Sequence, residues 1–491
     1  MAPHTENSRP NLLYIHSDQH CANVLGCYGD PVVQTPHLDW LAAQGVLFES
    51  AYCPSPICVP SRMSTLTGRH PHENDCWTNE HMLDSGIPTL AHAMGAAGYR
   101  PTLIGRMHAL GPDQLHGYAE RLVGDHSANY IGGYPDVDHG MLTGTQGPDR
   151  ISLVKSGPGL NAYEVHDEYV TSATIARLNE LGIQRRSGVP WEPFSLSVGL
   201  MLPHQPFVAR RQDYDKYAGH VPPPRHPEPF GPHLHPYFRW WRERCGITDV
   251  TDEEGMRART AYWALVNRVD DMVGEILTAL HRNGLAENTI IVYSSDHGEQ
   301  VGEHGLWWKQ TFYEEAVRVP MIISWPGHLP QGARCSQVVS AYDLNATILD
   351  ALQAPPLPNS HGRSLLPLAR GESDGWLGRA FSEYCTDEGC LHRMVRQDEW
   401  KLNYYHGQPP QLFNLREDPE ELHDRAQDPT CRSIREELTA IVLDGWDPDA
   451  VAKRLREKRA DVDILRQWAR HTRPQETYRW PLRPEMDYLD E

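Results

Sequence analysis

Two aspartates end apolar runs that predict buried strands, and each could supply an oxygen ligand to a metal ion. Asp18 ends the run "NLLYIHSD" and precedes Gln19. Asp296 and His297 end the run "NTIIVYSSDHG". In an open parallel sheet, ligands bind beyond the carboxyl ends of the strands. Two such strand ends predict a divalent cation site, and the alternative is that either aspartate caps a helix or a turn.

The predicted ligands constrain the metal without choosing it. Carboxylate and amide oxygens favour a hard cation such as Ca²⁺ or Mg²⁺. An imidazole nitrogen tolerates Mn²⁺ or a later metal better. We expect Ca²⁺, with Mn²⁺ as the alternative.

The stretch "SPICVPSRMSTLTGR" contains one cysteine, Cys58, followed closely by Ser61 and Arg62. The run from Ser61 is typical of a helix start, with Ser61 as the N-cap. Because a helix N-terminus favours an adjacent anion, one interpretation of Cys58 is a thiolate nucleophile. A Cys–His enzyme, however, has little use for a carboxylate-rich metal site beside its nucleophile. The other interpretation is a buried thiol that packs as a small hydrophobe.

Alternating strands and helices must position these residues. Apolar runs rich in β-branched residues predict buried strands, and helical patterns lie between them. The longest helical pattern begins with an acidic turn and ends at Asn283-Gly284. This alternation predicts an α/β fold with a mostly parallel sheet covered on both faces. The predicted strands lie at 11–18, 99–106, 194–202, 288–298 and 319–327, and the clearest helical patterns are "TPHLDWLAAQG", "IPTLAHAMGAAGY" and "TDEEGMRARTAYWALVNRVDDMVGEILTALHRNGL".

The pattern changes after about residue 378. The stretches "RMVRQDEWKLNYYHG" and "QLFNLREDPEELHDRA" predict an antiparallel hairpin pair followed by a helix. We therefore expect a catalytic domain over 1–377 and a smaller α+β subdomain with a short antiparallel sheet over 378–432. The segment 433–491 is predicted to be a helical and extended tail.

Composition limits the partners of the protein. The formal net charge of the 491 residues is −20, and the sequence shows no basic cluster, which argues against nucleic acid. No apolar run is long enough to span a bilayer, and the first residues lack the pattern of a signal peptide. We therefore expect a cytoplasmic protein without a membrane partner. None of the ten cysteines forms a C-x-x-C pair, which argues against a zinc ribbon or a thioredoxin motif.

The pentapeptide "CVPSR", with "TGR" following, resembles the signature of the type I sulfatases. The stretches "RPNLLYIHSDQH", "TPHLDWLAAQGVLFESAYCPSPICVPSR", "IVYSSDHGEQVGEHGLWWKQTFYEEAVRVPMIISWPG" and "LFNLREDPEE" resemble sulfatase blocks in the expected order. Together they cover the chain from about 10 to 430. The stretch "GRMHALGPDQLHGYAERL" is similar to the choline-sulfatase branch, whose neighbours are the phosphonate monoester hydrolases. The resemblance implies an alkaline-phosphatase-like sandwich.

The resemblance also implies a cofactor made from the chain itself. In this family a maturation enzyme oxidises the signature cysteine to formylglycine, an aldehyde that hydrates to a geminal diol. One hydroxyl attacks sulfur, and the second expels sulfate by reforming the aldehyde. A cation lowers the pKa of the diol, and Arg62 would orient it. By position, the metal ligands would be Asp18, Gln19, Asp296, His297 and the modified Cys58.

The remaining roles follow from the same resemblance. Arg106 and His108 match the family's Lys-x-His pair, with His108 as the base that helps to expel sulfate. Arginine at this position keeps the charge of lysine but presents a planar fork. His204 and Lys309 match residues that bind sulfate and protonate the leaving group. Asn79 matches a sulfate-contacting asparagine of the phosphonate-hydrolase branch.

These observations predict an enzyme that hydrolyses a small sulfate monoester to an alcohol and sulfate. The alternative is a phosphonate monoester or phosphodiester hydrolase on the same scaffold, and a third hypothesis is a non-catalytic binding protein that keeps the fold. A formylglycine-generating enzyme is the implied maturation partner. We also expect a homo-oligomer, a dimer or a tetramer, with the aromatic and proline-rich tail packing across a neighbouring subunit.

Overall fold

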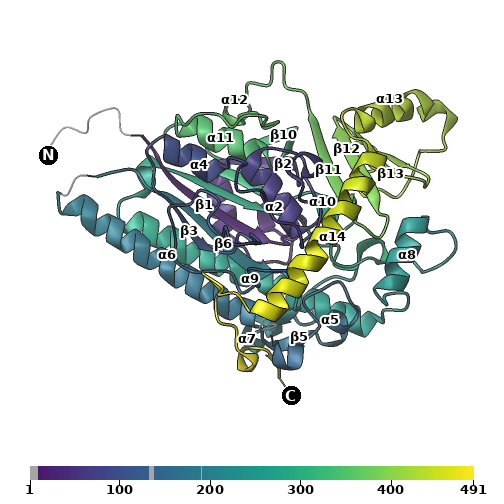
Figure 1. The fold of residues 1–491 in the computed structure, drawn as a ribbon, viewed down its shortest axis with the longest axis horizontal. Helices are drawn as coiled ribbons and strands as arrows, with labels where there is room; N and C mark the ends of the chain where they lie inside the picture. The colour runs from purple at the N-terminus through teal and green to yellow at the C-terminus, as the bar shows by residue number, and fades with distance from the viewer. Residues whose placement is uncertain (1–8, 132–137, 189–190, 491) are drawn as a thin grey trace.

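A central eight-stranded sheet organises the computed structural model, which describes residues 9–131, 138–188 and 191–490 (Figure 1). Its strands are β10 (Ala333–Ser340), β2 (Val46–Tyr52), β9 (Met321–Ser324), β8 (Thr289–Ser295), β1 (Asn11–Asp18), β6 (Ser195–Pro203), β3 (Pro101–Gly105) and β4 (Glu120–Arg121), in that spatial order.

Most strand pairs in this sheet are parallel. Strand β1 pairs in parallel with both β6 and β8, and only β9 runs antiparallel to its neighbours β2 and β8. Every residue of β1, β6 and β8 is buried. Such uninterrupted burial requires helices on both faces, because a strand with one solvated face would alternate polar and apolar residues. The predicted mostly parallel sheet is confirmed.

Two groups of helices cover the sheet (Figure 1). Helices α1 (Pro36–Ala43), α6 (Ala162–Arg186) and α9 (Asp252–Arg282) pack together on one face. Helices α2 (Cys58–Thr67), α4 (Leu90–Ala96) and α11 (Asp343–Ala351) pack together on the other. In the described residues, no helix combines the length and the apolar character needed to cross a membrane.

A second, antiparallel sheet lies in the C-terminal part of the chain. It consists of β11 (Arg379–Cys385), β12 (Leu391–Gln397), β13 (Trp400–Tyr405) and β14 (Gln411–Asn414), paired in sequence order. Helix α13 (Arg432–Leu443) packs on β12 and β13. The fully buried Lys401 of β13 pairs with Glu314 at 2.9 Å and Glu421 at 2.8 Å. The pair with Glu314 ties this sheet to helix α10 (Glu314–Val317) in the part of the chain that contains the central sheet. The predicted small antiparallel sheet is confirmed.

The C-terminal tail folds back onto its own chain. Helix α14 (Pro448–Thr472) crosses the front of the molecule (Figure 1). After α14, strand β15 (Tyr488–Leu489) pairs with β5 (Gly157–Leu160), which also pairs with β7 (Val208–Ala209). The side chain of Asp487 accepts a hydrogen bond from Ala162 N at 2.6 Å. The tail thus packs on its own chain.

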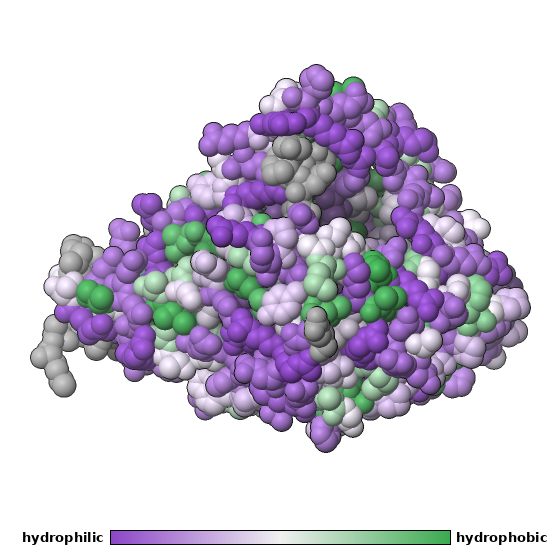
Figure 2. Space-filling view, turned by 90° about the horizontal axis from the view of Figure 1, so that it is seen from below, coloured by the Kyte–Doolittle hydropathy of each residue, from purple (hydrophilic) through white to green (hydrophobic). Residues whose placement is uncertain are grey.

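The surface seen from below in Figure 2 is mostly hydrophilic, with apolar residues in small separate groups. Such scattered apolar residues are normal for a protein surface. The remaining short helices are α3 (Pro71–Asn74), α5 (Ile151–Val154), α7 (Arg211–Tyr217), α8 (Pro236–Arg244), α10 (Glu314–Val317) and α12 (Leu366–Ala369), with 3₁₀ turns at Gly26–Tyr28, Gly140–Leu142, Ala286–Asn288, Glu303–Gly305, Pro429–Cys431 and Pro484–Met486.

One local prediction is wrong. Helix α2 begins at Cys58 with Ile57 as its N-cap, so Ser61 lies inside the helix and does not cap it. The hydroxyl of Ser61 instead donates to the carbonyl oxygen of Asp296 at 2.5 Å. The serine therefore joins α2 to the end of β8. The sequence patterns also failed to single out strands β2 and β10 and helix α6.

Candidate active site

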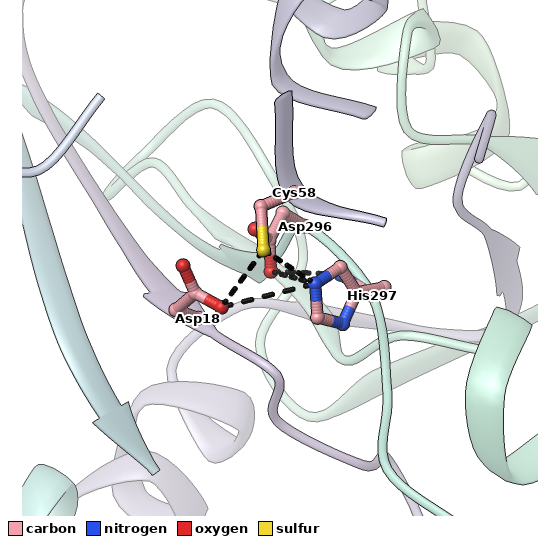
Figure 3. Close-up of side chains that lie close together, drawn as sticks. All are labelled: Asp18, Cys58, Asp296 and His297. Carbon is pink, nitrogen blue, oxygen red and sulfur yellow. Dashed lines mark hydrogen bonds and ion pairs between the residues drawn. The ribbon is translucent and has the colours of Figure 1, made fainter. Parts of the chain in front are cut away.

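Four side chains meet at the carboxyl edge of the central sheet (Figure 3). Asp18 is the last residue of β1, Asp296 and His297 follow β8, and Cys58 is the first residue of α2. One potential ligand atom from each of the four lies within 4.8 Å of the others, and all four residues are buried. The two strand ends predicted from the sequence are therefore adjacent, because β1 and β8 are neighbours in the sheet.

Cys58 lies at the centre of this group. Its Sγ lies 3.2 Å from His297 Nε2 and 3.7 Å from Asp18 Oδ1. Lys309 Nζ approaches the same sulfur at 3.3 Å. The Cys58 side chain also starts α2, where the helix dipole adds partial positive charge. The side chain at position 58 therefore has potential metal ligands, Asp18 and His297, on one side and the amino group of Lys309 on another.

Arg62 joins the two strand ends. Its Nε donates to Asp296 Oδ2 at 2.8 Å, and its Nη2 donates to Asp18 Oδ2 at 3.0 Å. Nη1 donates to His16 Nδ1 at 2.9 Å. Because Arg62 lies one turn after Cys58, this fork orients α2 relative to both aspartates. The planar guanidinium suits this task, since it donates in fixed directions.

Asp18 accepts from a second arginine as well. Arg106 Nε donates to Asp18 Oδ2 at 2.6 Å. Burial raises the pKa of Asp18, but Arg106 and Arg62 oppose burial and hold that pKa well below its usual range. The carboxylate is therefore ionised and can accept a cation through Oδ1, the oxygen that neither arginine contacts.

Arg106 also organises His108. Arg106 Nη2 donates to His108 Nδ1 at 2.8 Å, and Nη1 donates to Asp125 Oδ1 at 3.1 Å. Asp125 Oδ2 accepts a hydrogen bond from the backbone N–H of His108 at 3.1 Å. Burial and the charge of Arg106 lower the pKa of His108 well below its usual value. Arg106, His108 and Asp125 therefore form one hydrogen-bonded group next to Asp18.

Lys309 and Gln19 form another part of the site. Lys309 Nζ donates to Gln19 Oε1 at 2.6 Å, and Gln19 Nε2 donates to Gln205 Oε1 at 2.6 Å and also to Glu299. In this arrangement the amide oxygen of Gln19, the predicted metal ligand, is engaged by Lys309. Gln19 is nevertheless held at the edge of the metal-binding group, with its backbone N–H on Asp296 Oδ1 at 3.0 Å.

The other two predicted residues lie at the same edge. His204 is buried, and its Nδ1 lies 2.6 Å from the carbonyl oxygen of Gln205. Burial and the neighbouring charge of Lys309 lower the pKa of His204. Asn79 is half-buried, and its Oδ1 accepts from the backbone N–H of Val59 at 2.9 Å, next to Cys58. The geometry thus gathers every residue that the sequence assigned to the site.

The donor set fits a divalent cation. Asp18 Oδ1 and Asp296 Oδ1 lie 3.8 Å and 3.7 Å from His297 Nε2. His297 Nδ1 faces the carbonyl oxygen of Gly298 at 3.1 Å, so Nδ1 carries the proton and Nε2 presents a lone pair. Burial lowers the pKa of His297 to about 4, which keeps the ring neutral at pH 7. The two carboxylates suit a hard divalent cation, and the neutral imidazole can add a nitrogen ligand.

Sequence reasoning missed two buried acids at this site. Asp125 binds Arg106, and Glu299 accepts hydrogen bonds from Gln19 and from the backbone N–H groups of Val301 and Trp308. Glu299 lies only two residues after His297, so its position in the same block was a usable signal. Asp125 had no such signal, because it lies in a loop whose pattern is unlike the rest of the family blocks.

Comparisons with known proteins agree with this geometry. The family model described as Sulfatase matches residues 10–354, and the model for the C-terminal part of N-sulphoglucosamine sulphohydrolase matches 302–444. The chain is 31% identical over 475 residues to a choline-sulfatase of Rhizobium meliloti (strain 1021), covering 92% of this chain and 90% of the relative. It is 28% identical over 441 residues to arylsulfatase K of Homo sapiens, covering 84% of this chain and 78% of the relative.

Among solved structures, the phosphonate monoester hydrolase of Agrobacterium radiobacter superposes with a TM-score of 0.75 at 25% identity. The match covers 89% of this chain and 95% of that enzyme. The family model alone spans more than half of the chain, including the strand ends and Cys58. The chain therefore belongs to the sulfatase family and is a hydrolase of sulfate monoesters.

Proposed function

We propose that the protein hydrolyses a small sulfate monoester with a formylglycine formed from Cys58 and one divalent cation, Ca²⁺ in the first place and Mn²⁺ as the alternative. The observation that carries this proposal is the position of Cys58, with Sγ 3.2 Å from His297 Nε2 and 3.3 Å from Lys309 Nζ. When present, a hydrated formylglycine beside a cation supplies a nucleophile that a serine or cysteine hydrolase lacks. Asp18, Gln19, Asp296 and His297 would hold the cation.

The other residues of the site bind and neutralise the anionic substrate. Lys309 and Arg106 present positive charge beside Cys58 and Asp18, and both side chains are buried. In such a site fixed charges stabilise a transition state more strongly than they do in water. His204 and Lys309 are the residues proposed to bind sulfate and protonate the leaving oxygen. Asn79 would contact sulfate with the amide nitrogen that it does not use for Val59.

Maturation must precede the final packing of the chain. Cys58 is 0% exposed in the folded protein, and α2 is buried along its whole length. A modifying enzyme cannot reach such a thiol without unfolding α2. We therefore propose that a formylglycine-generating enzyme acts on the "CVPSR" segment before the domain closes. The cytoplasmic location and the homo-oligomeric state remain predictions.

A second candidate function is the hydrolysis of phosphonate monoesters or phosphodiesters. The likeness to a phosphonate monoester hydrolase over 89% of the chain supports this alternative. The Arg106–His108 pair favours sulfate. The deciding measurement is the ratio of kcat/KM for an aryl sulfate to kcat/KM for a phenyl phosphonate monoester, with the same leaving group. We expect the sulfate to be preferred, and a large preference for the phosphonate would overturn this choice.

A further inference from the structure

Two histidines of the site, His108 and His204, are in opposite tautomeric states. Arg106 Nη2 lies 2.8 Å from His108 Nδ1. A guanidinium group has only donors, so Nδ1 of His108 must accept this hydrogen bond. The neutral ring of His108 therefore carries its single proton on Nε2. Among the described residues, His108 Nε2 has no hydrogen-bond partner, and the side chain is half-buried, which leaves this N–H free for a ligand.

His204 has the reverse arrangement. Its Nδ1 lies 2.6 Å from the carbonyl oxygen of Gln205, and a carbonyl only accepts. Nδ1 of His204 therefore carries a proton, and Nε2 is the nitrogen that can gain or lose one. The neutral ring of His204 thus presents a lone pair on Nε2, whereas His108 presents an N–H there for as long as Arg106 donates to its Nδ1.

Asp125 prevents that movement. It accepts from Arg106 Nη1 and, through its other oxygen, from the backbone N–H of His108, each at 3.1 Å. The remaining guanidinium nitrogen, Nε, donates to Asp18 Oδ2 at 2.6 Å. The backbone N–H of Trp480 in the C-terminal tail donates to the carbonyl oxygen of Asp125 at 2.8 Å. A lysine has one nitrogen and could not make these three divergent contacts in fixed directions.

We propose that Asp125 is a positioning residue, which clamps Arg106 so that His108 serves the substrate as a hydrogen-bond donor through Nε2–H and not as a base. The inference rests on the proposed function, because it takes the group at Cys58 as the reacting centre. In this arrangement His108 stabilises negative charge on an oxygen of the substrate. This differs from the base role that the family resemblance implied for His108.

The test compares His108→Gln with His108→Ala in the metal-loaded, formylglycine-containing enzyme. The amide N–H of glutamine can stand near the position of Nε2–H, but the amide cannot accept a proton there. We expect His108→Gln to keep kcat for an aryl sulfate within about tenfold of the wild type, and His108→Ala to lose roughly 10²–10³-fold, as for removal of an oxyanion donor. An equal, severe loss in both variants would show a base and overturn the proposal, as would wild-type activity in the alanine variant.

A second comparison tests Asp125 independently. We expect Asp125→Asn to lower kcat by about 10–100-fold with little change in KM, as is usual for a residue that orients a catalytic side chain. The same substitution in the His108→Ala background should have little further effect, because the two residues act through one group. The exposed Asp84→Asn is the matched control. Full kcat in Asp125→Asn, or fully additive losses in the double variant, would contradict the proposed role.

The design separates this inference from the function itself. Thermal unfolding and metal content of each variant show whether it is folded and loaded. If the wild type prefers a phosphonate monoester, the same comparisons are made with that substrate, so an error in the substrate class leaves the test of His108 and Asp125 intact.

Discussion

The site has two halves that are built in different ways. The strand-end half consists of Asp18, Asp296 and His297, which lie at the carboxyl ends of two adjacent parallel strands. The loop half consists of Asn79, His108 and Asp125, which lie on irregular segments. Hydrogen bonds within the central sheet fix the first half. The second half depends on side-chain contacts and on the C-terminal tail. The sheet therefore positions the proposed metal ligands, and the loops position residues that we propose to serve the substrate.

The largest expected effect is the loss of the reacting centre. Cys58→Ala, or removal of the metal with a chelator, should reduce sulfate ester hydrolysis to the background rate, because the remaining residues supply no nucleophile. Steady-state assays with an aryl sulfate measure this, and restoring Ca²⁺ or Mn²⁺ should recover only the chelated wild type. Cys27→Ser, which changes a half-buried cysteine outside the site, is the control. Substantial activity in Cys58→Ala would place the nucleophile elsewhere.

Lys309 should give the next largest effect. Lys309→Met removes the cation that lies 3.3 Å from Cys58 Sγ, and we expect kcat to fall by roughly 10²–10³-fold. If Lys309 helps to protonate the leaving oxygen, an alkyl sulfate should lose more activity than a nitrophenyl sulfate, whose leaving group needs no proton. Lys216→Met changes a lysine outside the site and serves as the control. Equal losses for both substrates would assign Lys309 to sulfate binding alone.

Substitutions at Asn79 test whether the loop half contributes to substrate binding. Asn79→Ala should lower kcat/KM by about tenfold, the effect of losing one hydrogen bond to a charged group. Asn79→Asp keeps the acceptor for Val59 N but places a negative charge beside the sulfate, so we expect a larger loss. If Asn79 only supports the start of α2, the aspartate variant will instead be the more active of the two.

The smallest expected effect concerns the tail. Trp480 is buried against His166, with ring centroids 5.3 Å apart, next to the backbone contact with Asp125. Trp480→Ala should loosen this support and lower kcat several-fold, whereas Trp468→Ala, a 41% exposed tryptophan on α14, should have little effect. Kinetics at a temperature well below the unfolding transition separate this effect from lost stability. Indistinguishable kcat values for the two variants would show that Trp480 does not support the loop half.

The strand-end half could be predicted from the sequence, because its signals are local. Uninterrupted apolar runs indicate buried strands, and a carboxylate directly after such a run lies at the edge where ligands bind. The position of Cys58 beside the two aspartates followed from the family signature, although the N-cap of the helix lies four residues before Ser61. The longest helix, α9, was clear because its acidic first turn, its apolar periodicity and its end at Asn283-Gly284 agreed.

The loop half could be predicted only in part, for a physical reason. Asn79 and His108 were found because they match positions of the family, and their contacts could not be foreseen. Asp125 contacts Arg106 across a turn whose path depends on the tail, more than 350 residues later in the chain. Neither periodicity nor composition records such a contact. The packing of the tail on its own chain could not be predicted from the sequence for the same reason.

The central claim is that Cys58 becomes formylglycine, and mass spectrometry of the peptide that contains it tests this most directly. The protein should be produced with and without a formylglycine-generating enzyme, and activity should be measured on the same samples. We predict that the active sample contains a peptide in which the side chain CH₂–SH of Cys58 is replaced by CHO, and that activity rises in proportion to this fraction. An active enzyme in which Cys58 remains an unmodified thiol would contradict the account.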